Sequence, residues 1–416
     1  MRGVLPSPSP SRTPLIRCAA LTAAVAASLL AAAQPASAAQ KNPAQRPLRS
    51  WQVLAPGWTN ANKELGRVDD IVRVGRWVYI GGNFTVLGNH GGAKVTRMYL
   101  AAERAGTGKL RRNFHPKLNG RVYALAVSPN HRFLYVGGQF TSVGGHPRHN
   151  LAAFNLRTGK LSARIPDLGI PGYVRAVAVS RAGRIYIGGS FGRVGRLRRA
   201  NLAKLVMRGG RFGVSRRWAP TTNREVRDIV VSARAARVVV GGLFTAVNGH
   251  SGQAKIAALG QGRGRLLPWA SHPGSDILDL ALCGRRIYAA EGGPGGTALA
   301  YGLGGARRWY YMTDGNIQAT TCLGRRPVFG MHGDYVAPRK NQALNEFGSS
   351  RRILRHKLFM LSFKGVLMRW NPDVNSTAGV LGVWALAAGK GNLYVGGDFT
   401  GIHGVAQQRF AILRRG

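Results

Sequence analysis

Short apolar runs recur along the chain, and most of them end at a pair of glycines. The clearest are Val78–Thr85, Leu134–Thr141 and Leu393–Thr400, each of which reads apolar-Tyr-apolar-Gly-Gly-x-Phe-Thr. Runs this short, bounded by glycine-rich turns, are typical of β-strands and not of helices. The pattern also occurs at Ile185–Phe191 and Val238–Thr245, with degenerate copies at Ile287–Glu291 and Val328–His332.

Three further elements accompany each run in the same order. One reads Leu-Ala-Ala, as at Leu100 and Leu151, and another ends in an aromatic residue, as at Trp218 and Trp370. Four strands in a unit of about 50 residues predict an all-β, seven-bladed β-propeller with four-stranded blades. A tandem of sandwich domains would account less well for the constant order of the four elements in each unit. The remaining element precedes each run and starts at Val68, Val122, Val174, Val226, Ile277, Ile317 and Val383.

The two ends of the repeat region predict how the ring closes. The seventh unit stops after its third strand at Gly416, while a spare strand precedes the first unit at Trp51–Trp58. We expect this N-terminal strand to complete the last blade, which would remove an exposed strand edge. The propeller domain then spans 51–416, with a short linker at 39–50 and a basic insertion in blade six at about 337–357.

The first 38 residues have the pattern of an export signal. Arg2, Arg12 and Arg17 precede an apolar run, Cys18–Ala33, and Ala36–Ala38 reads as an A-x-A cleavage site. We therefore predict a secretory signal peptide at 1–38 and no transmembrane segment, since the run is short for a span. The mature protein is expected outside the cell or in the cell envelope.

These motifs resemble a known family. The blocks Tyr-Val-Gly-Gly-x-Phe-Thr, Val143–His146 and Asn150–Phe154 are similar to delta-60-type repeats, which build secreted bacterial β-propellers. The resemblance covers nearly the whole mature chain and is weakest in blades five and six. It implies the fold and export, and it implies no catalytic residue because the shared motif is structural.

Charge suggests the kind of partner. The chain has 60 Lys and Arg against 15 Asp and Glu, a net charge of +45. Such a surface attracts anionic polymers and repels copies of itself, so we expect a monomer. Nucleic acid is a poor physiological candidate for an exported protein. The densest basic segment is the insertion, whose predicted anion-binding residues are Arg339, Lys340, Arg351, Arg352, Arg355 and Lys357.

Two cysteines remain after removal of the signal peptide. Cys283 and Cys322 end equivalent first strands in blades five and six. First strands of adjacent blades are neighbours, and an exported protein meets an oxidising environment, so we predict a disulfide between them.

Candidate ligand-binding residues fall into two groups. Asp70, Asp228 and Asp279 share one position of the innermost strand and should line the central channel. They could hold a cation or a sugar, or form salt links to arginine, because a buried carboxylate needs a partner. The second group lies in loops after the Gly-Gly strands and comprises His146, His149, His250, His332 and Asp334.

Neither group predicts a metal centre or a cofactor. The histidines belong to different blades and should not converge on one ion. Gly188–Gly192 matches G-x-S-x-G, but it follows a repeat strand and lacks the strand-to-helix turn of a nucleophile elbow.

The favoured function is therefore that of a non-catalytic binding or scaffold protein, without a predicted catalytic residue. It would engage an anionic cell-envelope polymer or a protein partner through the channel mouth and the basic insertion. The alternative is a propeller enzyme, a polysaccharide lyase or hydrolase or a degenerate quinoprotein-like oxidoreductase, that uses the channel Asp and loop His residues.

Overall fold

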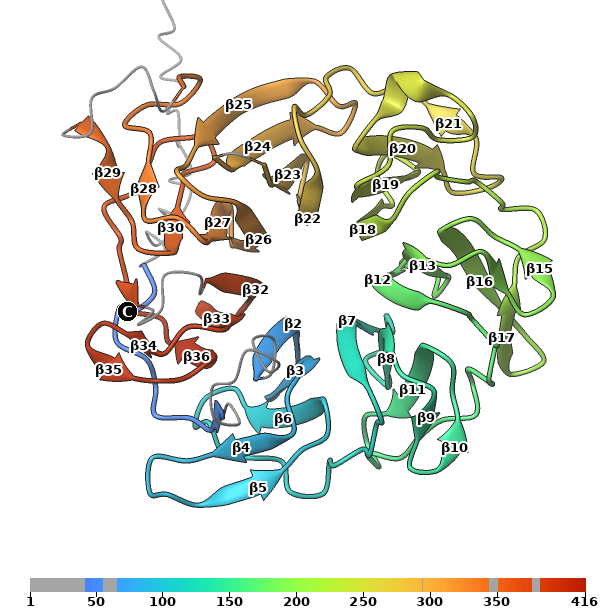
Figure 1. Ribbon diagram of the computed structural model, residues 1–416, viewed down its shortest axis with the longest axis horizontal. Helices are drawn as coiled ribbons and strands as arrows, with labels where there is room; N and C mark the ends of the chain where they lie inside the picture. Colours follow the sequence, from blue (N-terminus) through green and yellow to red (C-terminus); the bar gives the residue numbers. More distant parts are fainter. Residues whose placement is uncertain (1–41, 55–65, 294, 344–350, 376–381) are drawn as a thin grey trace, which may run out of the picture. The chain divides into compact units, whose positions relative to one another are not determined.

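The computed structural model describes residues 42–54, 66–293, 295–343, 351–375 and 382–416. Strands and turns make up nearly all of this part, with one 3-10 turn at Ser251–Gln253 (Figure 1). The predicted all-β class is confirmed. The predicted signal peptide at 1–38 lies outside the described residues.

Seven sheets, numbered here 1 to 7 along the chain, each begin with an antiparallel hairpin. The first strand of each hairpin is the element that starts with Val or Ile, and the second is the run that ends in Gly-Gly. The hairpins are β2 (Arg67–Val74) with β3 (Trp77–Asn83), β7 (Arg121–Val127) with β8 (Phe133–Gln139), β12 (Tyr173–Val179) with β13 (Ile185–Ser190), β18 (Val226–Ser232) with β19 (Arg237–Gly242), β22 (Ile277–Cys283) with β23 (Arg286–Glu291), β26 (Ile317–Leu323) with β27 (Arg326–Met331), and β32 (Val383–Gly389) with β33 (Asn392–Gly397).

A third strand extends every sheet, and a fourth strand is present in sheets 3, 4 and 5. Elsewhere the predicted fourth strand is reduced to isolated bridges. In sheet 1, for example, pairing stops at Arg111, whose buried side chain turns to donate to Tyr79 Oη and to the Leu156 carbonyl. The third strands are β6 (Leu100–Arg104), β11 (Leu151–Asn155), β16 (Leu202–Arg208), β20 (Ile256–Gly260), β24 (Thr297–Gly302), β30 (Leu358–Met360) and β36 (Phe410–Leu413); the fourth are β17 (Arg211–Val214), β21 (Leu266–Leu267) and β25 (Arg307–Met312).

Small sheets form in the loops that follow several second strands. They are β1 (Gln52–Val53) with β4 (Val86–Gly88) and β5 (Lys94–Thr96), β9 (Ser142–Val143) with β10 (His146–Pro147), β14 (Arg193–Val194) with β15 (Leu197–Arg198), β28 (Tyr335–Val336) with β29 (Ile353–Leu354), and β31 (Val374–Asn375) with β34 (Gly401–Ile402) and β35 (Val405–Ala406).

The first strands of the seven sheets pack side by side in chain order. Each contacts the first strand of the next sheet, and β32 of sheet 7 contacts β2 of sheet 1. Figure 1 shows these strands facing the centre of the described domain. The Gly-Gly pairs explain this packing, because the Val or Ile of one sheet fills the space that a Cβ on the first glycine of the preceding sheet would occupy. Examples are Val122 over Gly81 and Val226 over Gly188.

The chain ends meet at sheet 7, but not through the predicted residues. Pro43 and Leu48 form bridges to Arg415 and Ile412 along the edge of β36, so residues expected to be a linker lie there. Within the described part of the predicted strand, residues 51–54, Gln52–Val53 is a strand, and it pairs with β4 instead. Residues 55–65 lie outside the described part.

The predicted disulfide is confirmed. It joins Cys283 at the end of β22 to Cys322 in β26, with the two Cα atoms 6.2 Å apart. None of the helical segments among the described residues has the length and hydrophobicity that a membrane span requires.

Candidate functional site

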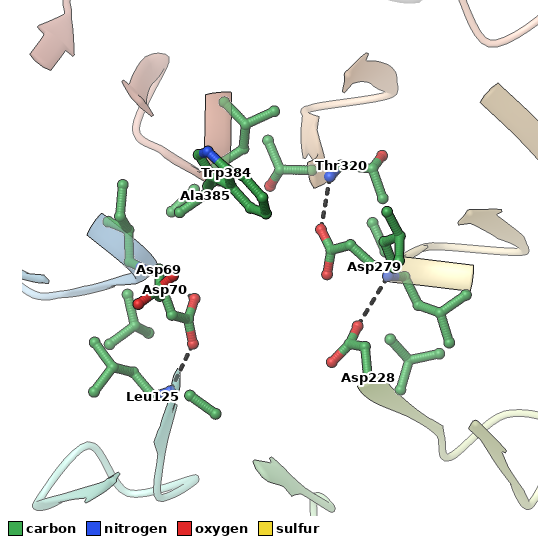
Figure 2. A pocket seen from close by; sticks show the side chains of 18 of the residues that line it. Asp69, Asp70, Leu125, Asp228, Asp279, Thr320, Trp384 and Ala385 are labelled. Carbon is green, nitrogen blue, oxygen red and sulfur yellow. Dashed lines mark hydrogen bonds between the residues drawn. The ribbon is translucent and has the colours of Figure 1, made fainter. Parts of the chain in front are cut away.

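The seven first strands line a central cavity of about 480 Å³, shown from close by in Figure 2. We call the end at which these strands begin the mouth. The hairpin turns between first and second strands lie at the opposite end. This follows because neighbouring first strands contact each other at equivalent positions and therefore run in the same direction.

One side chain from each sheet forms a ring at the mouth. It is the residue directly after the repeated Val or Ile, a position that the packing of the sheets leaves free to vary. The ring therefore carries charged, aromatic and amide side chains and not one repeated residue. This mouth ring consists of Asp69, Tyr123, Arg175, Arg227, Leu278, Gln318 and Trp384.

Three of the four arginines at the mouth ends of the first strands have a carboxylate partner. Asp69 accepts from Arg67 at 2.8 Å and binds Arg121 through both oxygens, at 2.7 and 2.9 Å. Arg227 pairs with Glu225 at 3.2 Å. Arg175 differs: its guanidinium lies 4.7 Å from the centre of the Tyr123 ring.

Arg175 has no hydrogen bond or ion pair with the described residues. It is half-buried and borders the cavity. Among the described residues, Arg175 is therefore the arginine of the mouth ring without an ion pair, while Arg227 keeps its ion pair to Glu225 but its Nε lacks a hydrogen-bond partner.

The three predicted channel acids lie just inside the mouth ring. Each accepts a backbone N–H from the first strand of the next sheet, and Figure 2 draws these bonds. Thus the partner of each acid is a neighbouring strand, and not the arginine expected for a salt link. The bonds join Asp70 to Leu125 at 2.6 Å, Asp228 to Leu280 at 2.9 Å and Asp279 to Thr320 at 2.6 Å.

These carboxyl groups hold protons more tightly than usual. Burial in the channel wall raises the pKa of Asp70 to about 7. Burial and the nearby charge of Asp228 raise the pKa of Asp279 well above its ordinary value, and burial raises that of Asp228. The two carboxyl groups of Asp228 and Asp279 also influence each other's pKa, so the pair retains a proton after an isolated carboxyl group would have lost it.

Among the predicted histidines, His332 comes nearest to the channel. Its ring lies 4.7 Å from that of Trp384 in the mouth ring, and Arg67 covers the same indole at 4.0 Å. Burial, together with the charges of Arg67 and Lys357, lowers the pKa of His332 to about 4, so the ring is neutral at pH 7.

The other predicted loop residues do not line the cavity. His146 and His250 are exposed, and His149 is paired with Asp167 at 2.7 Å. Asp334 receives the ammonium group of Lys357 at 2.9 Å. The structure thus separates the loop histidines from the channel acids, apart from the indirect contact of His332.

Two residues of the basic insertion serve the fold internally. Arg355 donates to the Met368 carbonyl at 2.9 Å, and Lys357 is buried and donates to the His332 carbonyl at 2.7 Å. Arg339, Lys340 and Arg351 are exposed, and Arg352 is half-buried. The net charge of the segment therefore overstates the number of cations that are available to an anionic ligand.

Sequence reasoning found the channel acids but missed the mouth ring. The signal was present, because each ring residue directly follows a repeated Val or Ile. Read down the seven copies, that position is the most variable of the first strand.

Neither a known protein family nor a curated protein matches the sequence. Among solved structures, the chain is similar to the WD40 β-propeller domain of Doa1, with a TM-score of 0.50 and 11% identity over 88% of this chain and 96% of that one. The fold is a β-propeller. The propeller is also similar to the computationally designed Ika8 protein, with a TM-score of 0.50 and 12% identity over 90% of this chain and 100% of that one.

Proposed function

We propose that the protein is a secreted, non-catalytic β-propeller that binds an anionic polymer of the cell envelope at its channel mouth. The seven sheets are its blades, and the segment around Pro43 and Leu48 serves as the closing strand beside β36. Export rests on the signal-peptide pattern at 1–38, and the resemblance to delta-60-type repeats supports the same location.

Arg175 carries this proposal. The other three arginines at the mouth ends of the first strands, Arg67, Arg121 and Arg227, have carboxylate partners, whereas Arg175 has none among the described residues. A partly desolvated guanidinium is stabilised by an anion, and its planar fork matches a carboxylate or a phosphate. An acidic group entering the mouth would complete this contact.

The surroundings favour a saccharide bearing the acidic group. Tyr123 and Trp384 border the cavity with aromatic surface, and Gln318 adds an amide that both donates and accepts. Below them, the acids can accept hydrogen bonds from hydroxyl groups. A polymer of sugar acids or sugar phosphates supplies all three kinds of contact.

The enzyme alternative has weaker support. Acid–base catalysis needs groups within hydrogen-bond reach of the reacting bond. The channel acids have raised pKa values, but each is hydrogen-bonded to the channel wall, and His146, His149 and His250 lie outside the cavity.

The test is binding of the mature protein to purified wall polymers across a salt series. Arg175→Ala should weaken binding at least about tenfold, as expected for loss of a charge-assisted hydrogen bond. Arg175→Lys should recover part of it. The matched control is Arg196→Ala, an exposed mouth-side arginine outside the cavity, which should change binding less than about twofold.

Equal losses in the Arg175 and Arg196 variants would reduce the interaction to general surface charge and overturn the proposal. So would failure of the wild type to bind at physiological salt. Combined replacement of Arg339, Lys340, Arg351 and Arg352 by Ala tests the insertion separately, and unchanged binding would exclude it from the contact. Retention of an acidic protein instead of a polymer would point to a protein partner.

A further inference from the structure

Among the described residues, the exposed acids lie on one side of the propeller. We call the side opposite the mouth the hairpin face, formed by the turns between first and second strands and the turns that follow the third strands. Glu103 is the described acid nearest to this face, and it is fully buried. The described acids outside the channel wall lie in segments at the mouth end: Asp167, Glu225, Asp276, Glu291, Asp314, Asp334, Asp373 and Asp398.

The hairpin face has the opposite composition, since exposed cations occur on it in every sheet. The turns between first and second strands contribute Arg76, Arg132, Arg181, Arg234, Arg285, Arg325 and Lys390. The ends of the third strands, the turns that follow them, the start of β25 and the chain end contribute Arg104, Arg157, Arg208, Arg263, Arg308, Lys364 and Arg415. Positive charge thus surrounds the channel on this side, with no exposed acid among the described residues to neutralise it.

One part of the face is hollowed. Asn130, Arg132 and Phe133 of sheet 2 form a cavity of about 540 Å³ with Asn155, Arg157 and Arg164. Arg164 stacks on Phe133 at 4.4 Å. The three guanidinium groups have no carboxylate partner among the described residues, so the hollow suits a phosphate group.

Apolar side chains stand among these cations. Val366 is 59% exposed and Met207 is 37% exposed. Val366 lies in the turn that follows β30, close to Lys364, and Met207 lies near the end of β16, next to Arg208. Apolar tips surrounded by basic residues are the pattern of proteins that rest on a lipid surface.

We propose that the hairpin face docks on an anionic lipid bilayer. The cations contact lipid phosphates, and Val366 and Met207 enter the headgroup region. A bilayer is favoured over a linear polymer because the cations surround the whole channel, whereas a polymer would contact only a path across them. Docking in this orientation directs the mouth away from the membrane, and the proposal does not depend on what the mouth binds.

Co-sedimentation of the mature protein with vesicles tests this proposal. We expect binding to mixed phosphatidylcholine and phosphatidylglycerol vesicles, little binding to phosphatidylcholine alone, and release at high salt. The face variant combines Arg132→Glu, Arg181→Glu, Arg234→Glu and Arg285→Glu, and should bind at least about tenfold more weakly. The matched control carries the same change of net charge at the mouth end: Arg193→Glu, Arg196→Glu, Arg198→Glu and Arg224→Glu.

The control should lose less than about threefold, because its charges lie away from the lipid in the docked orientation. Equal losses in the two variants would overturn the proposal, as would binding to soluble polyphosphate without binding to anionic vesicles. Val366→Ser leaves the charge unchanged and should weaken vesicle binding a few-fold. An unchanged thermal unfolding profile of each variant separates these effects from misfolding.

Discussion

At two junctions in the ring, adjacent sheets pack closely on each other but use different residues to do so. Between sheets 3 and 4, Val226 packs where a Cβ on Gly188 would lie. Between sheets 5 and 6, Ala290 occupies the glycine position and shares a buried cluster with Ile317, and the second glycine is replaced by Glu291. The second junction thus lacks the glycine pair that defines the repeat.

The junction without glycines has additional links between its sheets. Asp279 accepts the Thr320 N–H at 2.6 Å, and the Cys283–Cys322 disulfide joins the same two strands. Between sheets 3 and 4, by contrast, Ala176 stands at the aspartate position. The comparison teaches that the repeat preserves contact between first strands. The disulfide distinguishes the junction without glycines, because the aspartate hydrogen bond also occurs where the glycine is kept, as from Leu125 to Asp70 beside Gly81.

The largest expected effect is loss of the disulfide. Combined Cys283→Ser and Cys322→Ser should lower the free energy of unfolding by about 4 kcal/mol, given the sequence separation of 39 residues between the cysteines. The physical reason is that the cross-link restricts the unfolded chain. Guanidinium unfolding monitored by tryptophan fluorescence measures the change.

Reduced wild-type protein is the matched control and should unfold like the double variant. A double variant within about 1 kcal/mol of the oxidised wild type would show that the other contacts suffice at this junction.

The sequence was sufficient to predict the blade core because that core is set by local periodicity. Each Val or Ile and each Gly-Gly pair occurs at the same place in its unit, so the packing of one sheet on the next follows from the repeat. Chain closure was not predictable in the same way. The bridges from Pro43 and Leu48 to the C-terminal residues depend on pairing across the whole chain, and the aromatic pattern at Trp51–Trp58 pointed to the wrong segment for them.

The candidate site likewise has features that the repeat predicted and features that depend on how the sheets pack. The position of Asp70 in the channel wall followed from its place in the repeat, but its bond to the Leu125 N–H depends on the stagger between sheets, which the sequence does not reveal. Charge counting likewise identified Arg355 and Lys357 as cations. It could not show that their side chains turn inward to backbone carbonyls.

A second prediction exchanges the small residues of the two junctions. Gly188→Ala should cost about 2 kcal/mol, because the new methyl group would overlap Val226. Ala290→Gly should cost only about 1 kcal/mol, chiefly from the added flexibility of the unfolded chain. Chemical denaturation of both variants measures the difference, and equal costs would mean that the glycine is not required for close approach of the sheets.

The smallest expected effect concerns the hydrogen bond from the Leu125 N–H to Asp70, which joins sheets 1 and 2 at a junction that retains its glycine. Because the pKa of Asp70 is raised to about 7, the folded protein retains a proton that the unfolded chain releases above about pH 4. The stability due to this group is therefore complete below pH 4 and is lost as the pH rises to 7. Asp70→Asn removes the titration, so its stability relative to wild type should rise by about 1 kcal/mol between pH 4 and pH 7, a value reduced by contact with channel water.

Asp167→Asn is the control for this pH dependence. Burial tends to raise the pKa of Asp167, but hydrogen bonds from His149 and Gly169 outweigh it and lower the pKa. Its contribution is therefore lost only as the pH falls below about 4, and Asp167→Asn should show no rise between pH 4 and pH 7. Urea unfolding at the two pH values decides the matter. If Asp70→Asn were as flat as Asp167→Asn, the channel carboxyl group would titrate near its ordinary pKa, and the bridge to Leu125 would hold a charged group at pH 7.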